Sequence, residues 1–463
     1  MNTQRLFCGS ILLTLLSMLF MSPAPGRAQD EPLPHSPQAD AEWLDNIRQN
    51  HQQIAERLEF TYNSAENTAM LSNDDLYTLA VCRYYGGDYN GSLQICVVLR
   101  TFSEYAQKAF YLTALNYFQL YHDIEDWNIK MLLAIRECLL LNTDDPRTWM
   151  AIQSIFMTAP RSSGNTITQS FVRQLRQDCR GRFGENLIWG HLQQIRFQYD
   201  AAETAYMEAW RMAKKNPATL QALIWHYRQR GMLEQSLPPL RSMVLLQWDE
   251  RFAEELQRDE AALERLKKLK SGELQLAPVP ASSGKPVYQF PWPAGEARYL
   301  ADPSQYSPAA KNLAHEGRGQ HAYDFIMPAG SAICAMRSGT VIEIEQVGET
   351  DKGSKELVNF VAIRHDDGTI ARYFNIANVS CEFKLGESVH AGDVIAIVSR
   401  TYTTLSSHLH VDVVQKAPRK TGLPYYYRNC ETIPFEFAEW NTMNIPREDR
   451  LNAWHISLNS GRK

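Results

Sequence analysis

The sequence has no excess of positive charge and, beyond its first residues, no long apolar run. Lysine and arginine number 47 against 52 aspartates and glutamates in 463 residues, which gives a formal net charge of -5. A protein that binds nucleic acid gathers positive charge on one face, so we expect no nucleic-acid partner. No segment after residue 28 is apolar over the length that a bilayer requires, so we expect no stable membrane span in the mature chain.

Cysteine is sparse for a chain of this length. Of the 8 cysteines, Cys8 lies in the first apolar stretch. The others are Cys82, Cys96, Cys138, Cys179, Cys334, Cys381 and Cys430. Their odd number leaves at least one thiol unpaired, and their wide, irregular spacing matches neither a zinc ribbon nor a dense disulfide framework. We interpret most of them as small buried apolar residues.

The first 28 residues have the pattern of a cleaved secretion signal. Arg5 supplies the positive start, residues 6–21 are apolar, and Gly26 and Ala28 offer small residues at the two positions that define a cleavage site. An uncleaved anchor is the weaker interpretation, because the apolar run is short and Pro23 and Pro25 follow at once. We therefore expect a signal peptide at 1–28 and a periplasmic or secreted mature protein.

Residues 29–270 have a helical period and internal repetition. Apolar residues recur at steps of three and four, with few β-branched runs. A recurring spacing appears at Ser92, Cys96 and Leu99, at Asn128, Leu132 and Ile135, at Ala202, Tyr206 and Ala209, and at Ser236, Leu240 and Met243. Because small residues let helices approach and large ones fill the groove, this repetition predicts stacked helical hairpins in a tetratricopeptide-like (TPR-like) array. Such an array is either a binding surface for a protein partner or a brace for the next domain.

A change of composition marks a second domain. Residues 271–290 are rich in proline, glycine and serine, which indicates a linker. In residues 291–415 the period becomes two, and short segments such as "TVIEIEQV" and "DVIAIVSR" alternate with Gly, Asp and Asn turns, which predicts an all-β domain. Residues 416–463 are rich in aromatics, and we expect this C-terminal extension to fold back over the sheet. The predicted fold class is multidomain α + β, with the helical array followed by the all-β domain.

Histidines are crowded in the second domain. In "SSHLHVDVV", His408 and His410 are two residues apart, so in a strand both imidazoles project from one face. In "GRGQHAYDFIMPAG", Asp324 follows a histidine by three residues. A hydrolytic zinc site needs three N or O ligands and one open position for water. Asp324, His410 and a histidine upstream of Asp324 would supply that set.

Three segments resemble a lysostaphin-type (LytM-like, β-lytic) zinc metallopeptidase domain over residues 291–415: "HEGRGQHAYDFIMPAGSAICAMRSGTVIEI", "VAIRHDDGTIARYFNIANVSCEFKLGESVHAGDVIAIV" and "SSHLHVDV". The resemblance implies an all-β metallopeptidase fold, a Zn²⁺ cofactor and peptidoglycan cross-linking peptides as substrate. It also implies that Asp324 and His410 are zinc ligands and that His408 assists the bound water.

The remaining zinc ligand has two candidates. The usual motif of the family has a histidine four residues before the aspartate, where this chain has Gln320. His321 lies three residues before Asp324, whereas His315 lies nine before it and matches a branch of the family with the form S-H-x-G-x-x-x-Y-A-x-D-F. In an extended segment an i, i+3 pair points to opposite faces, so we favour His315 and keep His321 as the alternative.

One active-site position departs from the family pattern. The family has Tyr-x-His-Leu where this chain has "YFNI", so Asn375 replaces the second active-site histidine. On a strand Asn375 would share the face of Tyr373, where it could donate a hydrogen bond but not exchange a proton. Two functions therefore stay open. One is a zinc metalloendopeptidase that cleaves peptidoglycan peptides, and the other is a degenerate module that binds peptidoglycan or regulates another cell-wall hydrolase.

Overall fold

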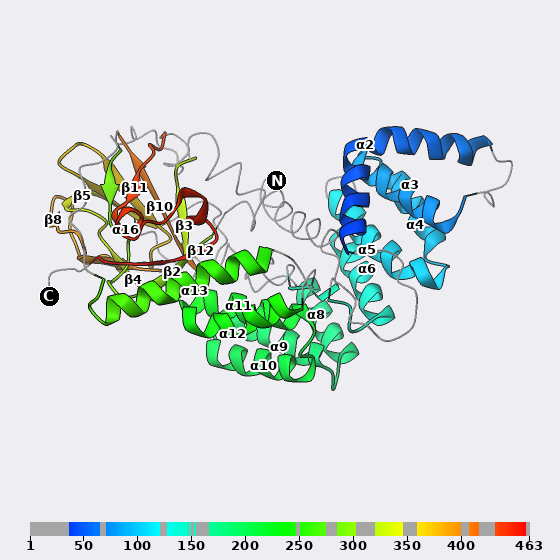
Figure 1. Cartoon of the computed structure of the whole chain (residues 1–463), viewed down its shortest axis with the longest axis horizontal. Helices are drawn as coiled ribbons and strands as arrows, with labels where there is room; N and C mark the ends of the chain where they lie inside the picture. Colours follow the sequence, from blue (N-terminus) through cyan, green and yellow to red (C-terminus); the bar gives the residue numbers. More distant parts are fainter. Residues whose placement is uncertain are drawn as a thin grey trace.

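A computed structural model of the chain has a helical half and a β-rich half: in Figure 1 the helices run from the right of the view to beneath the β-rich half at the left. It describes residues 37–64, 71–120, 127–146, 148–149, 152–153, 166–246, 251–274, 285–301, 320–345, 359–399, 407–415 and 431–459. The expected signal peptide at 1–28 lies outside these residues. Among the helices that are described, none is both long and apolar enough to cross a membrane.

In the helical half, helices that follow one another in the chain pack together. The described helices are α2 (Pro37–Ser64), α3 (Asn73–Tyr85), α4 (Tyr89–Leu99), α5 (Ser103–Gln119), α6 (Trp127–Leu141), α8 (Thr166–Asp178), α9 (Phe183–Ile195), α10 (Tyr199–Met212), α11 (Pro217–Arg230), α12 (Leu233–Leu245) and α13 (Arg251–Lys270). Packing is most extensive between α3 and α4, α5 and α6, α9 and α10, and α11 and α12. We call this set the helical array. Its TPR-like character stays a prediction.

The recurring positions on α10 and α12 lie where helices of the array meet. On α10 and α12 each of them is buried: Ala202, Tyr206, Ala209, Ser236, Leu240 and Met243. Gly190 on α9 leaves room for the ring of Tyr206, because a Cβ atom there would collide with that ring. The small residues thus let neighbouring helices approach, and the large ones fill the space between them.

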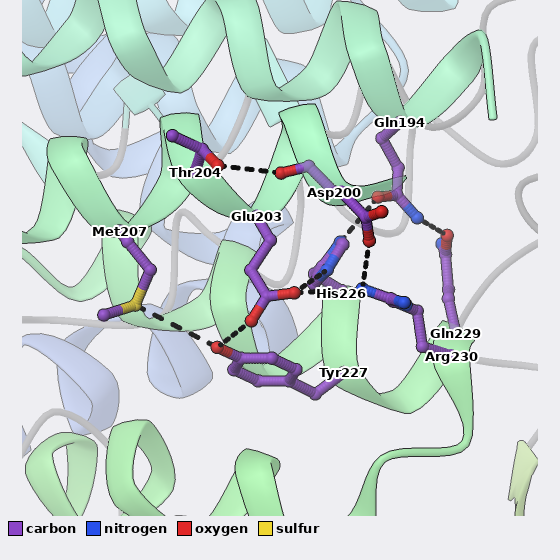
Figure 2. Close-up of polar contacts among 9 residues, drawn as sticks. All are labelled: Gln194, Asp200, Glu203, Thr204, Met207, His226, Tyr227, Gln229 and Arg230. Atoms are coloured by element: carbon purple, nitrogen blue, oxygen red, sulfur yellow. Dashed lines mark hydrogen bonds and ion pairs between the residues drawn. The ribbon is translucent and has the colours of Figure 1, made fainter. Parts of the chain in front are cut away.

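A buried polar network joins α9, α10 and α11 (Figure 2). His226 Nδ1 on α11 lies 2.7 Å from Gln194 Oε1 on α9. On α10, Glu203 accepts a hydrogen bond of 2.9 Å from Arg230. Burial, aided by the nearby charge of Arg230, lowers the pKa of His226 to about 3, so its ring is neutral. Because these side chains bridge different helices, the network fixes the positions of the helices relative to one another.

The β-rich half is built on one eight-stranded antiparallel sheet. The described strands are β1 (Val287–Tyr288), β2 (Ala297–Ala301), β3 (Tyr323–Ile326), β4 (Ala332–Cys334), β5 (Gly339–Glu345), β6 (Phe360–Arg364), β7 (Ile370–Phe374), β8 (Ser388–Val389), β9 (Val394–Ile397), β10 (His408–Val414), β11 (Glu436–Phe437) and β12 (Ala453–Ile456). The sheet has the order β12-β2-β3-β10-β7-β6-β5-β8, and β1–β11 and β4–β9 form separate pairs. The multidomain α + β fold class is confirmed.

The two faces of the large sheet differ in character. One face carries Phe325, Leu409 and Tyr373, which are fully buried in the main hydrophobic core of this half. Asp324, His408 and His410 alternate with these core residues along their strands, so they project from the opposite face. We call this second face the site face.

Residues from both ends of the β-rich half complete its sheets. Strand β1 lies in the expected linker 271–290 and pairs in parallel with β11. Strand β12 lies in the 416–463 extension and pairs with β2 at the edge of the large sheet. Part of the extension therefore continues the sheet, where the sequence pattern predicted a covering over it. The pairing satisfies the backbone groups that β2 would otherwise leave open at an edge.

The end of the helical array shares a core with the β-rich half. Trp225 of α11, Leu233 of α12 and Leu266 of α13 belong to the same hydrophobic cluster as Tyr299 of β2. Helix α13 contacts β12 and runs along the β-rich half in Figure 1. The guanidinium carbon of Arg228 lies 4.3 Å from the centroid of the Tyr299 ring. The last helices are thus packed into the fold of the second half.

The described cysteines are all free thiols. Cys82, Cys96, Cys138, Cys179 and Cys334 are buried, and Cys381 is half-buried. Burial raises the pKa of each of these thiols. They have the character of small buried apolar residues. Cys430 lies outside the described residues.

Candidate metal centre

Three neighbouring strands position the polar residues of the site face. His410 on β10 lies directly opposite Asp324 on β3 and opposite Phe374 on β7. Residues that oppose each other in antiparallel strands project from the same face. His408 is two residues before His410 on β10, so it shares that face. The register therefore gathers one carboxylate and two imidazoles on adjacent strands.

The side chains of this group lie within interaction distance of one another. Asp324 Oδ1 is 2.8 Å from His410 Nδ1 and 4.0 Å from His408 Nε2. His408 Nε2 is in turn 2.9 Å from Asn375 Nδ2. The side chains of His410, His408 and Asp324 are 12, 13 and 19% exposed, whereas Phe374 beside them is buried. These three polar side chains are therefore partly accessible to solvent.

Asn375 reaches His408 because the backbone leaves the strand at this residue. Its φ angle is 64°, in the left-handed region that asparagine tolerates better than most residues. Tyr373, two residues earlier, is fully buried on the core face, and its hydroxyl accepts a hydrogen bond of 2.8 Å from the Met336 backbone N–H. The expectation that Asn375 shares the face of Tyr373 is therefore wrong. The alternation of the strand ends one residue before Asn375.

The two candidates for the remaining ligand are placed differently. His315 lies in 302–319, outside the described residues. His321 precedes β3, and its backbone N–H donates a hydrogen bond of 3.2 Å to Thr432 Oγ1. Burial lowers the pKa of His321, and the charges that act on it are those of Lys285 and Glu431. His321 thus lies near the residues that precede β1 and β11.

Asp324, Asn375, His408 and His410 all lie in a segment that matches a known protein family. Residues 318–421 match the model of Peptidase family M23. The chain carries an M23 domain. The lysostaphin-type resemblance of the motifs is confirmed, and a helical region precedes the domain.

Solved structures of M23 peptidases resemble part of the chain. Lysostaphin from Staphylococcus simulans is 19% identical, with 25% of this chain and 42% of lysostaphin covered and a TM-score of 0.20. A zinc-containing peptidase from Vibrio cholerae is 19% identical, with 28% of this chain and 37% of that one covered and a TM-score of 0.21. Pseudoalterin, an M23 metalloprotease from the deep sea, is 14% identical, with 28% and 70% covered and a TM-score of 0.20. The match thus spans less than half of the first two proteins.

The donor atoms of the M23 domain suit a zinc ion chemically. Asp324 offers oxygen and His410 offers nitrogen, which are the donor types of hydrolytic zinc sites. Zinc–ligand bonds of about 2.0–2.1 Å in a tetrahedron place two donors roughly 3.3 Å apart, so the 2.8 Å contact needs to open by about half an ångström. Within the described residues, no group of three or more His, Cys, Asp or Glu side chains could hold a metal ion. The favoured third donor, His315, lies outside them.

Sequence reasoning missed a buried ion pair beside the site. Asp412, two residues after His410 on β10, accepts hydrogen bonds of 2.7 and 2.6 Å from Arg372 on β7, and both residues are buried. Arg372 also lies over the ring of Phe374, which contacts the ring of His410 edge-on at 5.4 Å. His410 is thus held between Phe374 and Asp324. The alternation of side chains in "HLHVD" predicts that Asp412 shares the face of His408 and His410. Its partner Arg372 could not be predicted, because that pairing depends on the register between β10 and β7.

Proposed function

We propose that the protein is an exported zinc metalloendopeptidase that hydrolyses peptide cross-links of peptidoglycan. The observation that carries the proposal is the convergence of Asp324 Oδ1, His410 Nδ1 and His408 Nε2 on one face of an M23 domain. The signal-like residues 1–28 support export to the periplasm or the medium.

Asp324 and His410 are the proposed metal-holding residues. His315 completes the set, with His321 as the alternative. Zinc, when bound, supplies Lewis acidity, which lowers the pKa of water to about 7 and polarises a carbonyl group. The carboxylate of Asp324 would compensate part of the positive charge of the zinc ion. The Phe374 ring keeps the His410 imidazole turned toward Asp324, so that its Nδ1 stays available as a donor.

His408 is the proposed proton-transfer residue. Its Nε2 lies 4.0 Å from Asp324 Oδ1, beside the metal-holding atoms. The Asn375 amide donates to this nitrogen when the nitrogen is unprotonated, which is the form that accepts a proton. When His408 becomes charged, the nearby carboxylate of Asp324 stabilises that charge. Asn375 orients His408 and offers a hydrogen-bond donor to the developing oxyanion.

A second candidate is a degenerate M23 module. It would bind peptidoglycan, or regulate another cell-wall hydrolase, with the helical array as the surface for a protein partner. Asn375 favours this candidate, because an amide cannot exchange a proton as the usual histidine does. The two candidates share zinc binding and differ in turnover.

The deciding experiment measures zinc and cleavage on the same full-chain preparation. Purified protein is loaded with zinc and incubated with peptidoglycan, and new peptide ends are identified by mass spectrometry. We expect His408→Ala to keep its zinc and to lose activity by about 10²-fold or more. His390→Ala is the matched control, since His390 is an exposed histidine of the same domain that pairs with Asp393. Zinc-loaded wild-type protein that cleaves nothing would favour the second candidate.

A further inference from the structure

A buried cluster of charged side chains lies where the end of the helical array docks on the β-rich half. Arg228 of α11 lies over the ring of Tyr299 on β2, at 4.3 Å. Its Nη2 atom is 3.0 Å from Glu255 Oε2 and 3.5 Å from Asp259 Oδ2, both on α13. Helix α13 in turn contacts β12, which pairs with β2. We call this contact of α11 and α13 with β2 and β12 the joint.

The cluster holds one guanidinium group and two carboxyl groups. Glu255 is the nearer to Arg228 and is 17% exposed, so both Arg228 and water stabilise its charge. Asp259 is fully buried, and within the described part of the chain neither of its oxygens accepts a hydrogen bond. A carboxylate in such a place is costly to keep charged, and it takes up a proton instead. Arg228 is therefore matched by Glu255, and Asp259 is the carboxyl that becomes neutral.

Burial is the largest influence on Asp259 and raises its pKa to about 7. The charge of Arg228 acts to lower this pKa, and the charge of Glu255 acts to raise it. From β12, Trp454 also acts to lower the pKa, although its indole N–H forms no hydrogen bond with a described residue. Arg228 and Trp454 together do not offset the burial. A charge therefore appears inside the joint as the pH passes neutrality.

We propose that Asp259 makes the joint sensitive to pH: the neutral carboxyl lets the array end dock on the sheet, and ionisation of this carboxyl loosens the docking. An exposed aspartate has a pKa of about 3.9, so the pKa of Asp259 is higher in the docked joint than in an open one. The stabilisation from the neutral form is full below about pH 4 and is lost as the pH rises to about 7. Each pH unit in this window raises the equilibrium constant for opening about tenfold. The device needs neither zinc nor turnover, so it stands apart from the proposed function.

Hydrogen exchange at the joint tests the proposal. The full chain and its variant Asp259→Asn are exchanged at pH 5, 6, 7 and 8, and mass spectrometry follows the peptides of α13 and β12. Asparagine is neutral at every pH and has nearly the size of aspartic acid, so the ratio of the two opening constants isolates the ionisation of Asp259. We expect this ratio, wild type over variant, to rise about tenfold per unit up to pH 7 and to level off above it. A ratio that does not change with pH overturns the proposal.

The sign of the effect at pH 8 separates the two charge states of Asp259. We expect the joint of Asp259→Asn to open more rarely than that of the wild type, because the variant holds no buried carboxylate. If Asp259 is instead ionised and paired with Arg228 in the docked joint, the variant leaves the guanidinium less compensated and opens more often, which overturns the proposal. Glu260→Gln is the matched control, because Glu260 is an exposed carboxylate of α13 that pairs with Arg241. This control should follow the wild type at every pH.

A direct titration decides the matter if Asp259→Asn does not fold. The protein is labelled with ¹³C at its aspartate carboxyls, and NMR follows each resonance with pH. We expect one aspartate to titrate near pH 7 in the wild type and at a lower pH in Glu255→Gln. The reason is that removal of the nearer carboxylate leaves Arg228 to match Asp259. Aspartates that all titrate below about pH 5 overturn the proposal, as does a titration near pH 7 that Glu255→Gln leaves unchanged.

Discussion

Two histidines of the helical array, His191 and His226, lie in surroundings that contrast with those of His408 and His410 in the M23 domain. In the array, His226 Nδ1 contacts Gln194 and His191 Nδ1 contacts the Tyr206 hydroxyl at 2.8 Å, and burial lowers the pKa of both histidines to about 3. In the M23 domain, His410 Nδ1 contacts a carboxylate, and both histidines stay partly exposed. The first pair is kept neutral by its surroundings, and the second is suited to bind a cation.

A carboxylate alone does not account for this difference. His226 Nε2 also lies 3.7 Å from Glu203, but that carboxylate is already compensated by Arg230 at 2.9 Å. Asp324 contacts His410 at 2.8 Å and is 19% exposed. A histidine beside a carboxylate therefore indicates a metal site only where the pair reaches solvent, as Asp324 and His410 do and the fully buried His226 does not.

Removing the site carboxylate gives the largest expected effect. We expect Asp324→Ala to lower the zinc content from about one per chain to near zero, because two of three ligands do not hold the ion tightly. Glu203→Ala, which removes the carboxylate near the array histidine, should leave the zinc content unchanged. Elemental analysis after metal loading and dialysis measures both. Equal zinc in wild type and Asp324→Ala would contradict the metal centre.

The choice between the two upstream histidines is the next test. We expect His315→Ala to lose most of its bound zinc and His321→Ala to keep it, since the charges near His321 are those of Lys285 and Glu431. Zinc titration in competition with a chelator measures both affinities. The reverse result would assign His321 as the ligand.

Breaking the ion pair beside the site should cost most in folding stability. Arg372→Met leaves Asp412 as a buried charge without its partner, so we expect a loss of about 3–5 kcal/mol in the free energy of unfolding. Replacing both residues by apolar ones should cost less. Arg241→Met is the control, because its exposed pair with Glu260 should contribute under about 1 kcal/mol. Urea unfolding measures all of these variants, and similar losses from Arg372→Met and Arg241→Met would contradict the expectation.

Asn375→His restores the side chain that the family has at this position. Deleting one oxyanion-stabilising group typically costs about 10²–10³ in rate, so we expect the substitution to raise the cleavage rate by up to about 10². The backbone permits the change, because histidine is also enriched in the left-handed region that Asn375 occupies. Steady-state cleavage of a peptidoglycan peptide measures the gain. No gain in a zinc-loaded variant would favour the regulatory candidate.

Acid should weaken the array through its neutral histidines. The pKa of His226 falls from about 6.5 in the unfolded chain to about 3 in the folded one. Between these values the unfolded chain binds more protons, so the wild type loses stability as the pH falls, by up to about 1.4 kcal/mol per pH unit for this residue. In His226→Gln this contribution should vanish. Urea unfolding between pH 7 and pH 4 measures the difference in slope, and parallel curves would contradict the expectation.

The sequence predicts the parts of the site that follow from local alternation. The spacing of His408 and His410 needs only an extended strand to bring both imidazoles to one face. Asn375 could not be placed this way, because its left-handed backbone ends the alternation. The partner of Asp412 and the pairing of β12 depend on contacts between distant segments, which no local pattern encodes. The helical period gives the hairpins but not the docking of α11 on Tyr299.

The pairing of β12 with β2 has a consequence for the order in which the chain can fold. Strand β12 is made of residues 453–456, far along the chain from its partner β2 at 297–301, and β2 in turn pairs with β3, which carries Asp324. Long-range pairing of this kind is slow, because the closure entropy of the intervening loop must be overcome before the contact stabilises the fold. A ribosome-bound or truncated chain that ends before residue 453 keeps β2 as an open edge. Pairing of β12 with β2 is therefore expected to be a late step in the folding of this sheet.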